Sequence, residues 1–219
     1  MSQTRTVTLK CSGCGAPNDF TVYDSVNVSI DHELKKKVLD GSIFKMHCKK
    51  CEASIVVKYD LLYHDMSEFR PLLIQCFQEK NGWEKVNSAN AKIRKMMREM
   101  NRTEQFPHRV VIGYNALRET IRIFDSGYDD RIMFVAKRVF ATLLKRDGVP
   151  CTGIQFCSRD KNRSPIFSVL DNENQEKFYS LPFETYDNIS EKLLRILPED
   201  SGEFILIDDS FIEPYLKKI

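Results

Sequence analysis

The chain carries two C-x-x-C stretches, Cys11-Ser12-Gly13-Cys14 and Cys48-Lys49-Lys50-Cys51. Together they supply four thiolates, which is the ligand set of a closed tetrahedral zinc site. Because four protein ligands leave no position for water, such a metal stabilises the fold and does not activate a substrate. The sequence therefore predicts Zn²⁺ as a structural cofactor bound by Cys11, Cys14, Cys48 and Cys51.

The residues around both stretches favour β-structure. Residues 7–10 and 43–48 are typical of strands that run into the two stretches, and residues 55–59 of a strand that leaves the second. This layout is that of a zinc ribbon, in which two hairpin turns, or knuckles, meet at one metal. The spacer of residues 15–47 is longer than the roughly 15–20 residues of simple ribbons, so we expect the site to be embedded in a larger domain.

Two other uses of the cysteines are less favoured. A thioredoxin-like redox pair needs a strand-to-helix junction, whereas residues 15–17 lead from Cys14 into further β-type sequence. His47 could replace a cysteine ligand, but neighbouring residues on a strand face opposite sides.

The remainder of the chain alternates between helical and strand patterns, which predicts an α+β fold. We expect a zinc-ribbon-like β domain over residues 1–106 and a mixed α/β region over residues 107–219. Apolar residues recur at helical or strand spacing throughout. The expected helices are 32–39, 86–100, 115–124, 130–143, 182–197 and 209–216, and the expected later strands are 70–77, 109–112, 154–156, 165–170, 177–181 and 204–207.

Composition excludes several classes of protein. The 219 residues are 42% hydrophobic and 29% charged, with a formal net charge of +2, so no global charge favours nucleic acid or an anionic membrane. No apolar run approaches the roughly 18 residues of a membrane-spanning helix, and the N-terminus lacks the apolar segment of a signal peptide. We expect a cytoplasmic protein with reduced thiols and no membrane association.

A second candidate site precedes the helix at 130–143, where Asp125, Asp129, Asp130 and Arg131 lie close in sequence. Grouped carboxylates can hold a metal or share a proton. Capping of the helix by Asp129 or Asp130 is a simpler explanation of these residues than a metal or proton-sharing site, and we favour it.

A basic segment over residues 85–102 includes Lys92, Arg94, Lys95 and Arg98. It could bind phosphates or an acidic partner. We favour the simpler interpretation, a solvated outer face of a helix, because the segment lacks the interleaved aromatic residues that would stack on bases.

The first knuckle, the residues before the second knuckle and several other stretches carry a family resemblance. Taken together, they make the chain similar to the bacterial CpXC domain family over about residues 7–145. The resemblance implies zinc binding in a bacterial cytosolic protein and implies no particular reaction. One position departs from the family pattern, which has proline after the first cysteine where this chain has Ser12. The matching stretches are 25–28, 31–34, 39–44, 57–65, 109–111, 115–117 and 121–132.

No reaction signature occurs in the sequence, so we expect a non-enzymatic binding or regulatory module with a protein partner. Three alternatives stay open. The first is an enzyme whose site lies at the junction of the two regions and uses Asp125, Asp129 and Asp130. The second is a nucleic-acid binder that uses the knuckles and the basic segment. The third is a redox switch that releases zinc when its thiols are oxidised.

Overall fold

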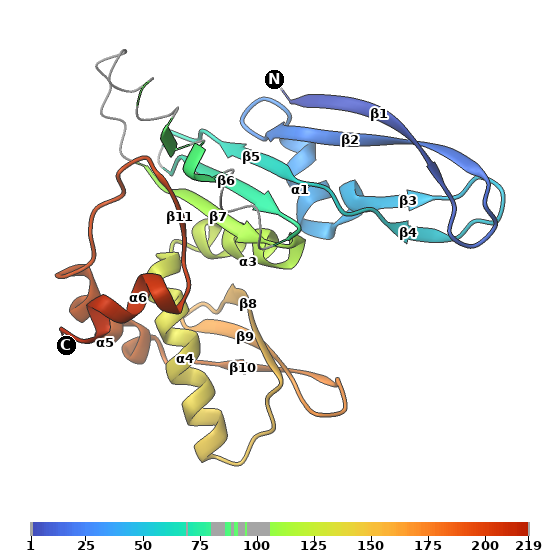
Figure 1. Cartoon of the computed structure of the whole chain (residues 1–219). Helices are drawn as coiled ribbons and strands as arrows, with labels where there is room; N and C mark the ends of the chain where they lie inside the picture. Colours follow the sequence, from blue (N-terminus) through green and yellow to red (C-terminus); the bar gives the residue numbers. More distant parts are fainter. Residues whose placement is uncertain are drawn as a thin grey trace. The chain divides into compact units, whose positions relative to one another are not determined.

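The chain folds as a mixture of helices and sheets, as predicted (Figure 1). The computed structural model describes residues 2–68, 70–79, 86–88, 90–91, 95 and 106–218. These residues form two compact units. The first unit is Met1–Leu117 with Asp200–Ile205, and the second is Arg118–Glu199 with Leu206–Ile219. The predicted domain boundary after residue 106 stays a prediction.

A six-stranded sheet with the order β1-β2-β5-β6-β7-β11 organises the first unit. β1 pairs with β2 and β5 with β6 in antiparallel fashion, whereas β2 pairs with β5 and β6 with β7 in parallel. The central strand β6 reads as a nearly continuous apolar run because it is buried on both faces. The strands are β1 (Gln3–Lys10), β2 (Pro17–Asn27), β5 (Leu61–Asp65), β6 (Leu72–Phe77), β7 (His108–Ile112) and β11 (Phe204–Leu206).

One row of side chains across this sheet forms the centre of the core. The register places Val26, Tyr63 and Ile74 opposite one another, and all three are fully buried. The next residue in the row is Arg109, which is only 1% exposed. Its guanidinium Nη1 donates to Asp200 Oδ1 at 2.7 Å, so a buried ion pair ends an apolar row.

The segment between β2 and β5 holds a helix and a second hairpin. Helix α1 (His32–Asp40) buries Leu34 and Val38. It ends at Gly41, whose φ of 78° is the left-handed conformation that glycine adopts without strain. A short 3₁₀ turn, η1 (Ser42–Phe44), then leads into the two-stranded sheet of β3 (Lys45–His47) and β4 (Ser54–Val56).

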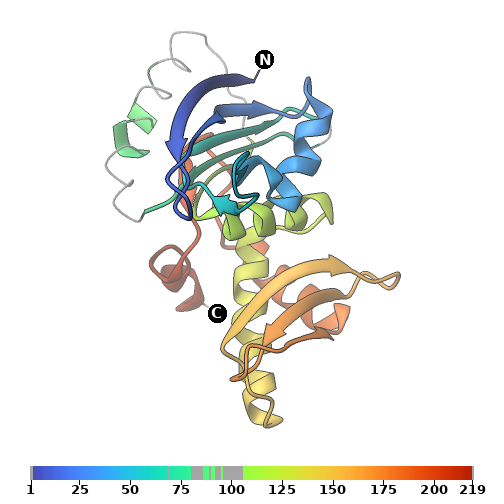
Figure 2. The same ribbon diagram turned by 90° about the vertical axis from the view of Figure 1, so that its right-hand side faces the viewer.

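The strands predicted at 154–156, 165–170 and 177–181 form a meander in the second unit, a three-stranded antiparallel sheet with the order β10-β9-β8. Helix α4 lies across one face of it (Figure 2). There the ring of Phe140 stacks on Phe167 with centroids 5.0 Å apart. Val139 and Leu143 of α4 are only partly buried. The elements are α4 (Asp130–Arg146), β8 (Gly153–Arg159), β9 (Pro165–Leu170), β10 (Glu176–Ser180), α5 (Phe183–Leu194) and α6 (Asp209–Leu216).

Most of the predicted helix over residues 86–100 lies outside the described residues. No helix in the described part of the chain combines the length and the apolar character needed to cross a membrane.

Candidate metal centre

The two knuckles share one backbone design. In the first, which joins β1 to β2, the N–H of Cys11 donates to the carbonyl of Ala16 at 2.9 Å. In the second, which joins β3 to β4, the N–H of Cys48 donates to the carbonyl of Ala53, also at 2.9 Å. The first cysteine of each stretch is therefore held at the base of a closed hairpin turn.

A left-handed residue completes each turn. Gly15 has φ of 70°, a conformation that glycine adopts without strain, and its N–H donates to the Cys11 carbonyl at 2.8 Å. Glu52 holds the equivalent place with φ of 59°, and its N–H donates to the Cys48 carbonyl at 2.9 Å. A residue with a Cβ atom pays roughly 1–2 kcal/mol for that conformation, so the second knuckle keeps its shape at a local cost.

The four cysteine side chains converge as the spacing predicts. Cys11 Sγ lies 3.6 Å from Cys51 Sγ, and Cys14 Sγ lies 3.6 Å from Cys48 Sγ, so each close contact joins the two knuckles. All four sulfur atoms lie within 4.8 Å of one another. Zinc–sulfur bonds of about 2.3 Å give a tetrahedron with edges of about 3.8 Å. The four cysteines thus have the separation that a tetrahedrally coordinated metal ion requires.

The electrostatics of the cluster are uneven. Backbone N–H groups of Cys51 and Lys50 stabilise the Cys48 thiolate and lower its pKa to about 6. The Ala16 N–H lowers the pKa of Cys14, but the neighbouring thiols and burial outweigh it and raise that pKa to about 12. Four thiolates at this separation repel one another, so their joint deprotonation requires a cation between them.

Asn18 is a polar residue of the site that sequence reasoning missed. Its side chain is 4% exposed. The Nδ2 group donates to the Ala16 carbonyl at 3.0 Å and to Cys48 Sγ at 3.5 Å, while Oδ1 accepts from the Lys49 N–H at 2.9 Å. One amide therefore ties the two knuckles together. Asparagine is uncommon in β-strands, so its presence in a β-rich stretch was the sequence feature that could have pointed to a role for Asn18.

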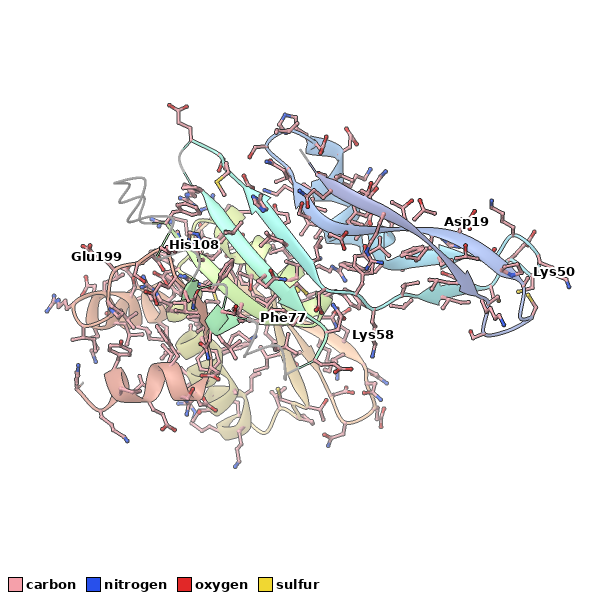
Figure 3. All side chains as sticks on the ribbon, turned by 45° about the horizontal axis from the view of Figure 1, so that its top comes forward. Asp19, Lys50, Lys58, Phe77, His108 and Glu199 are labelled. Atoms are coloured by element: carbon pink, nitrogen blue, oxygen red, sulfur yellow. The ribbon has the colours of Figure 1, made fainter. Side chains whose placement is uncertain are left out.

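The comparisons with known proteins agree with this geometry. The family model described as CpXC protein matches residues 9–137, more than half of the chain. The chain belongs to the CpXC family. No curated protein and no solved structure matches it. The matched region of this CpXC protein contains both knuckles, which lie together at one end of their hairpins, near Lys50 in Figure 3.

The second candidate site of the CpXC protein lies around the start of α4. Asp129 is the N-cap residue, as predicted, and its Oδ1 accepts from the Arg131 N–H at 2.9 Å. The same oxygen accepts from Arg131 Nε at 3.0 Å, and Arg131 Nη1 donates to the Pro198 carbonyl at 2.6 Å. Asp125 is exposed at the end of α3 (Tyr114–Asp125), and Asp130 is buried. These contacts account for Asp129 and Arg131 structurally, and a chemical role for the group stays a prediction.

Substitution of Asp129 separates its capping role from its charge. We expect Asp129→Ala to lower the free energy of unfolding by about 2 kcal/mol, because it removes both the cap and the partner of Arg131. Asp129→Asn keeps an oxygen that can cap the helix and is expected to cost clearly less. Denaturant unfolding of both variants measures the difference. Equal losses would mean that the ion pair, and not the cap, is the important contact.

The predicted basic surface falls mostly outside the described residues. Lys92, Arg94 and Arg98 are not among them, and Lys95 is an exposed helical residue.

Proposed function

We propose that this CpXC protein binds one Zn²⁺ through Cys11, Cys14, Cys48 and Cys51 in a zinc-ribbon-like arrangement. The observation that carries the proposal is the convergence of the four sulfur atoms within 4.8 Å. Soft thiolate ligands in tetrahedral geometry suit zinc, with iron as the main competitor. The metal would join two hairpins that are separated in sequence, and its binding free energy would add to the stability of the fold.

A closed shell of four thiolates favours a structural role, so we propose a non-enzymatic binding or regulatory module in the cytoplasm. In this role the metal holds the β1–β2 and β3–β4 hairpins in one orientation, and the exposed surface of these hairpins is available to a partner. The experiment that tests the proposal is the metal content of the purified protein by mass spectrometry. About one zinc per chain is expected, with none in Cys11→Ser and Cys48→Ser. Iron in place of zinc, or a metal-free folded protein, would overturn it.

Asn18 provides a test that leaves all four cysteines in place. We expect Asn18→Ala to weaken zinc affinity about 10- to 100-fold, since it removes the amide that orients Cys48 and the second knuckle. Competition with a chromophoric chelator measures the affinity. The matched control is Asp19→Ala, because the exposed Asp19 side chain is the next one along β2 and bonds to Thr8. Equal affinity in the two variants would contradict the role given to Asn18.

A further inference from the structure

Strand β10 forms an open edge of the three-stranded sheet. It is the first strand in the order β10-β9-β8, and no other strand in the described ranges pairs with its outer side. Four of its five residues are exposed. An edge strand carries a row of unpaired backbone groups and is a template for another strand.

The backbone hydrogen bonds show which residues of β10 face outward. The Gln175 carbonyl accepts a bond from the chain that follows β9 at 3.1 Å, and the Leu181 N–H donates to the start of β9 at 2.9 Å. Partners alternate along an antiparallel strand, so odd-numbered residues face β9. The N–H and carbonyl groups of Glu176, Phe178 and Ser180 therefore face the open side.

The opposite edge of the sheet is protected in ways that β10 is not. On β8, the N–H of Phe156 donates to Glu119 Oε1 at 2.7 Å. A register shift between Phe156 and Ser158 also interrupts β8. Side-chain cover and bulges are two devices that block strand addition. The pairing of β10 with β9 is uninterrupted from Glu176 to Ser180, so no bulge disrupts this edge.

The side chains of β10 also favour contact with another strand. Phe178 stands at the centre of the strand with 62% of its surface exposed. Charged residues often protect an edge, but both charges of β10 are engaged within the sheet. Glu176 accepts a hydrogen bond from Ser168 Oγ, and Lys177 Nζ lies 3.2 Å from Asp171 Oδ2.

We infer that β10 pairs with β10 of a second copy of this chain, antiparallel and across a twofold axis at Phe178. The two three-stranded sheets then form one sheet of six strands. In this register Phe178 faces the partner's Phe178 and Glu176 faces the partner's Ser180. A twofold axis at Glu176 or at Lys177 would instead place like charges opposite each other, which is destabilising.

The charges of the two turns of the meander favour the same arrangement. The turn from β9 to β10 carries Asp171 and Glu173, and the turn from β8 to β9 carries Lys161 and Arg163 with one acid, Asp160. These turns lie at opposite ends of the sheet. Antiparallel pairing of two β10 strands brings the acidic turn of one copy to the same end as the basic turn of the other. Opposite charges at each end of the joined sheet favour a second copy as the partner of the edge, although the two turns lie about three strand spacings apart and salt weakens their attraction.

Sedimentation of the 219-residue chain in zinc-containing buffer, from low micromolar to several hundred micromolar concentration, tests the inference. A monomer–dimer equilibrium is expected. Phe178→Asp should raise the dimer Kd at least about tenfold, because it places two carboxylates opposite each other. Leu194→Asp is the matched control, since Leu194 is also highly exposed, at 57%, but lies on α5. Its Kd should equal that of the wild type.

Amide hydrogen exchange tests the register. At high protein concentration the amides of Glu176, Phe178 and Ser180 should become protected, whereas those of Lys177 and Tyr179 are protected at every concentration. A protein that stays monomeric at every concentration overturns the inference, and the edge of β10 is then free to pair with a strand of another protein. A dimer that survives Phe178→Asp, or that leaves the even-numbered amides unprotected, also overturns it, because that dimer uses another surface.

Discussion

Cys51→Ser is expected to lower the free energy of unfolding by more than about 4 kcal/mol, although Cys51 is exposed. Substitution of an exposed side chain normally changes stability by about 0.5 kcal/mol or less. The larger loss follows from the proposed zinc site, because Cys51 Sγ lies 3.6 Å from Cys11 Sγ and supplies the fourth ligand. Denaturant unfolding in zinc-containing buffer measures the effect.

Two comparisons separate the metal from other causes. Lys50→Ser changes an exposed neighbour in the same turn and should leave stability nearly unchanged. An excess of chelator should remove most of the difference between Cys51→Ser and the wild type, since ligand binding stabilises the folded state only while the ligand is present. A difference that persists unchanged in chelator would show that Cys51 stabilises the fold without a metal.

Asp200→Ala is expected to cost about 3–5 kcal/mol, because it leaves the guanidinium of Arg109 buried without its carboxylate. The two side chains are 1% and 18% exposed, and their closest atoms are 2.7 Å apart. The double variant Arg109→Met/Asp200→Ala should be more stable than Asp200→Ala alone, since it removes the buried charge together with its partner. Unfolding of the single and double variants provides the measurement.

The exposed ion pair of Arg5 with Asp24 is the matched control for this prediction. Its atoms are 3.0 Å apart, but the side chains are 55% and 48% exposed. Asp24→Ala should therefore cost no more than about 1 kcal/mol. If Asp200→Ala and Asp24→Ala had the same small effect, the Arg109–Asp200 pair would not stabilise the first unit.

The local features of this chain could be read from its sequence because each depends on residues close together. The closed turns of both knuckles use bonds between residues four or five apart, and the spacing of Cys11 and Cys14 is enough to predict one. The cap at Asp129 and the meander of β8, β9 and β10 depend on similar short-range signals.

Contacts between distant segments could not be read in the same way. The parallel pairings of β2 with β5 and of β6 with β7 join strands with long connections, and periodicity does not specify a partner. Nothing in the sequence predicts the burial of Arg109 either, because a charged residue in a short strand is exposed by default. Its partner Asp200 is 91 residues away.

The sequence by itself determined that four cysteines form two knuckles, since the C-x-x-C spacing and the glycine at position 15 act within single turns. Only the tertiary structure decided that Asn18 ties the knuckles together, that Asp200 neutralises Arg109 and that β10 is left at an open edge. Each of these depends on which strands become neighbours, and that choice is made by the packing of the whole core.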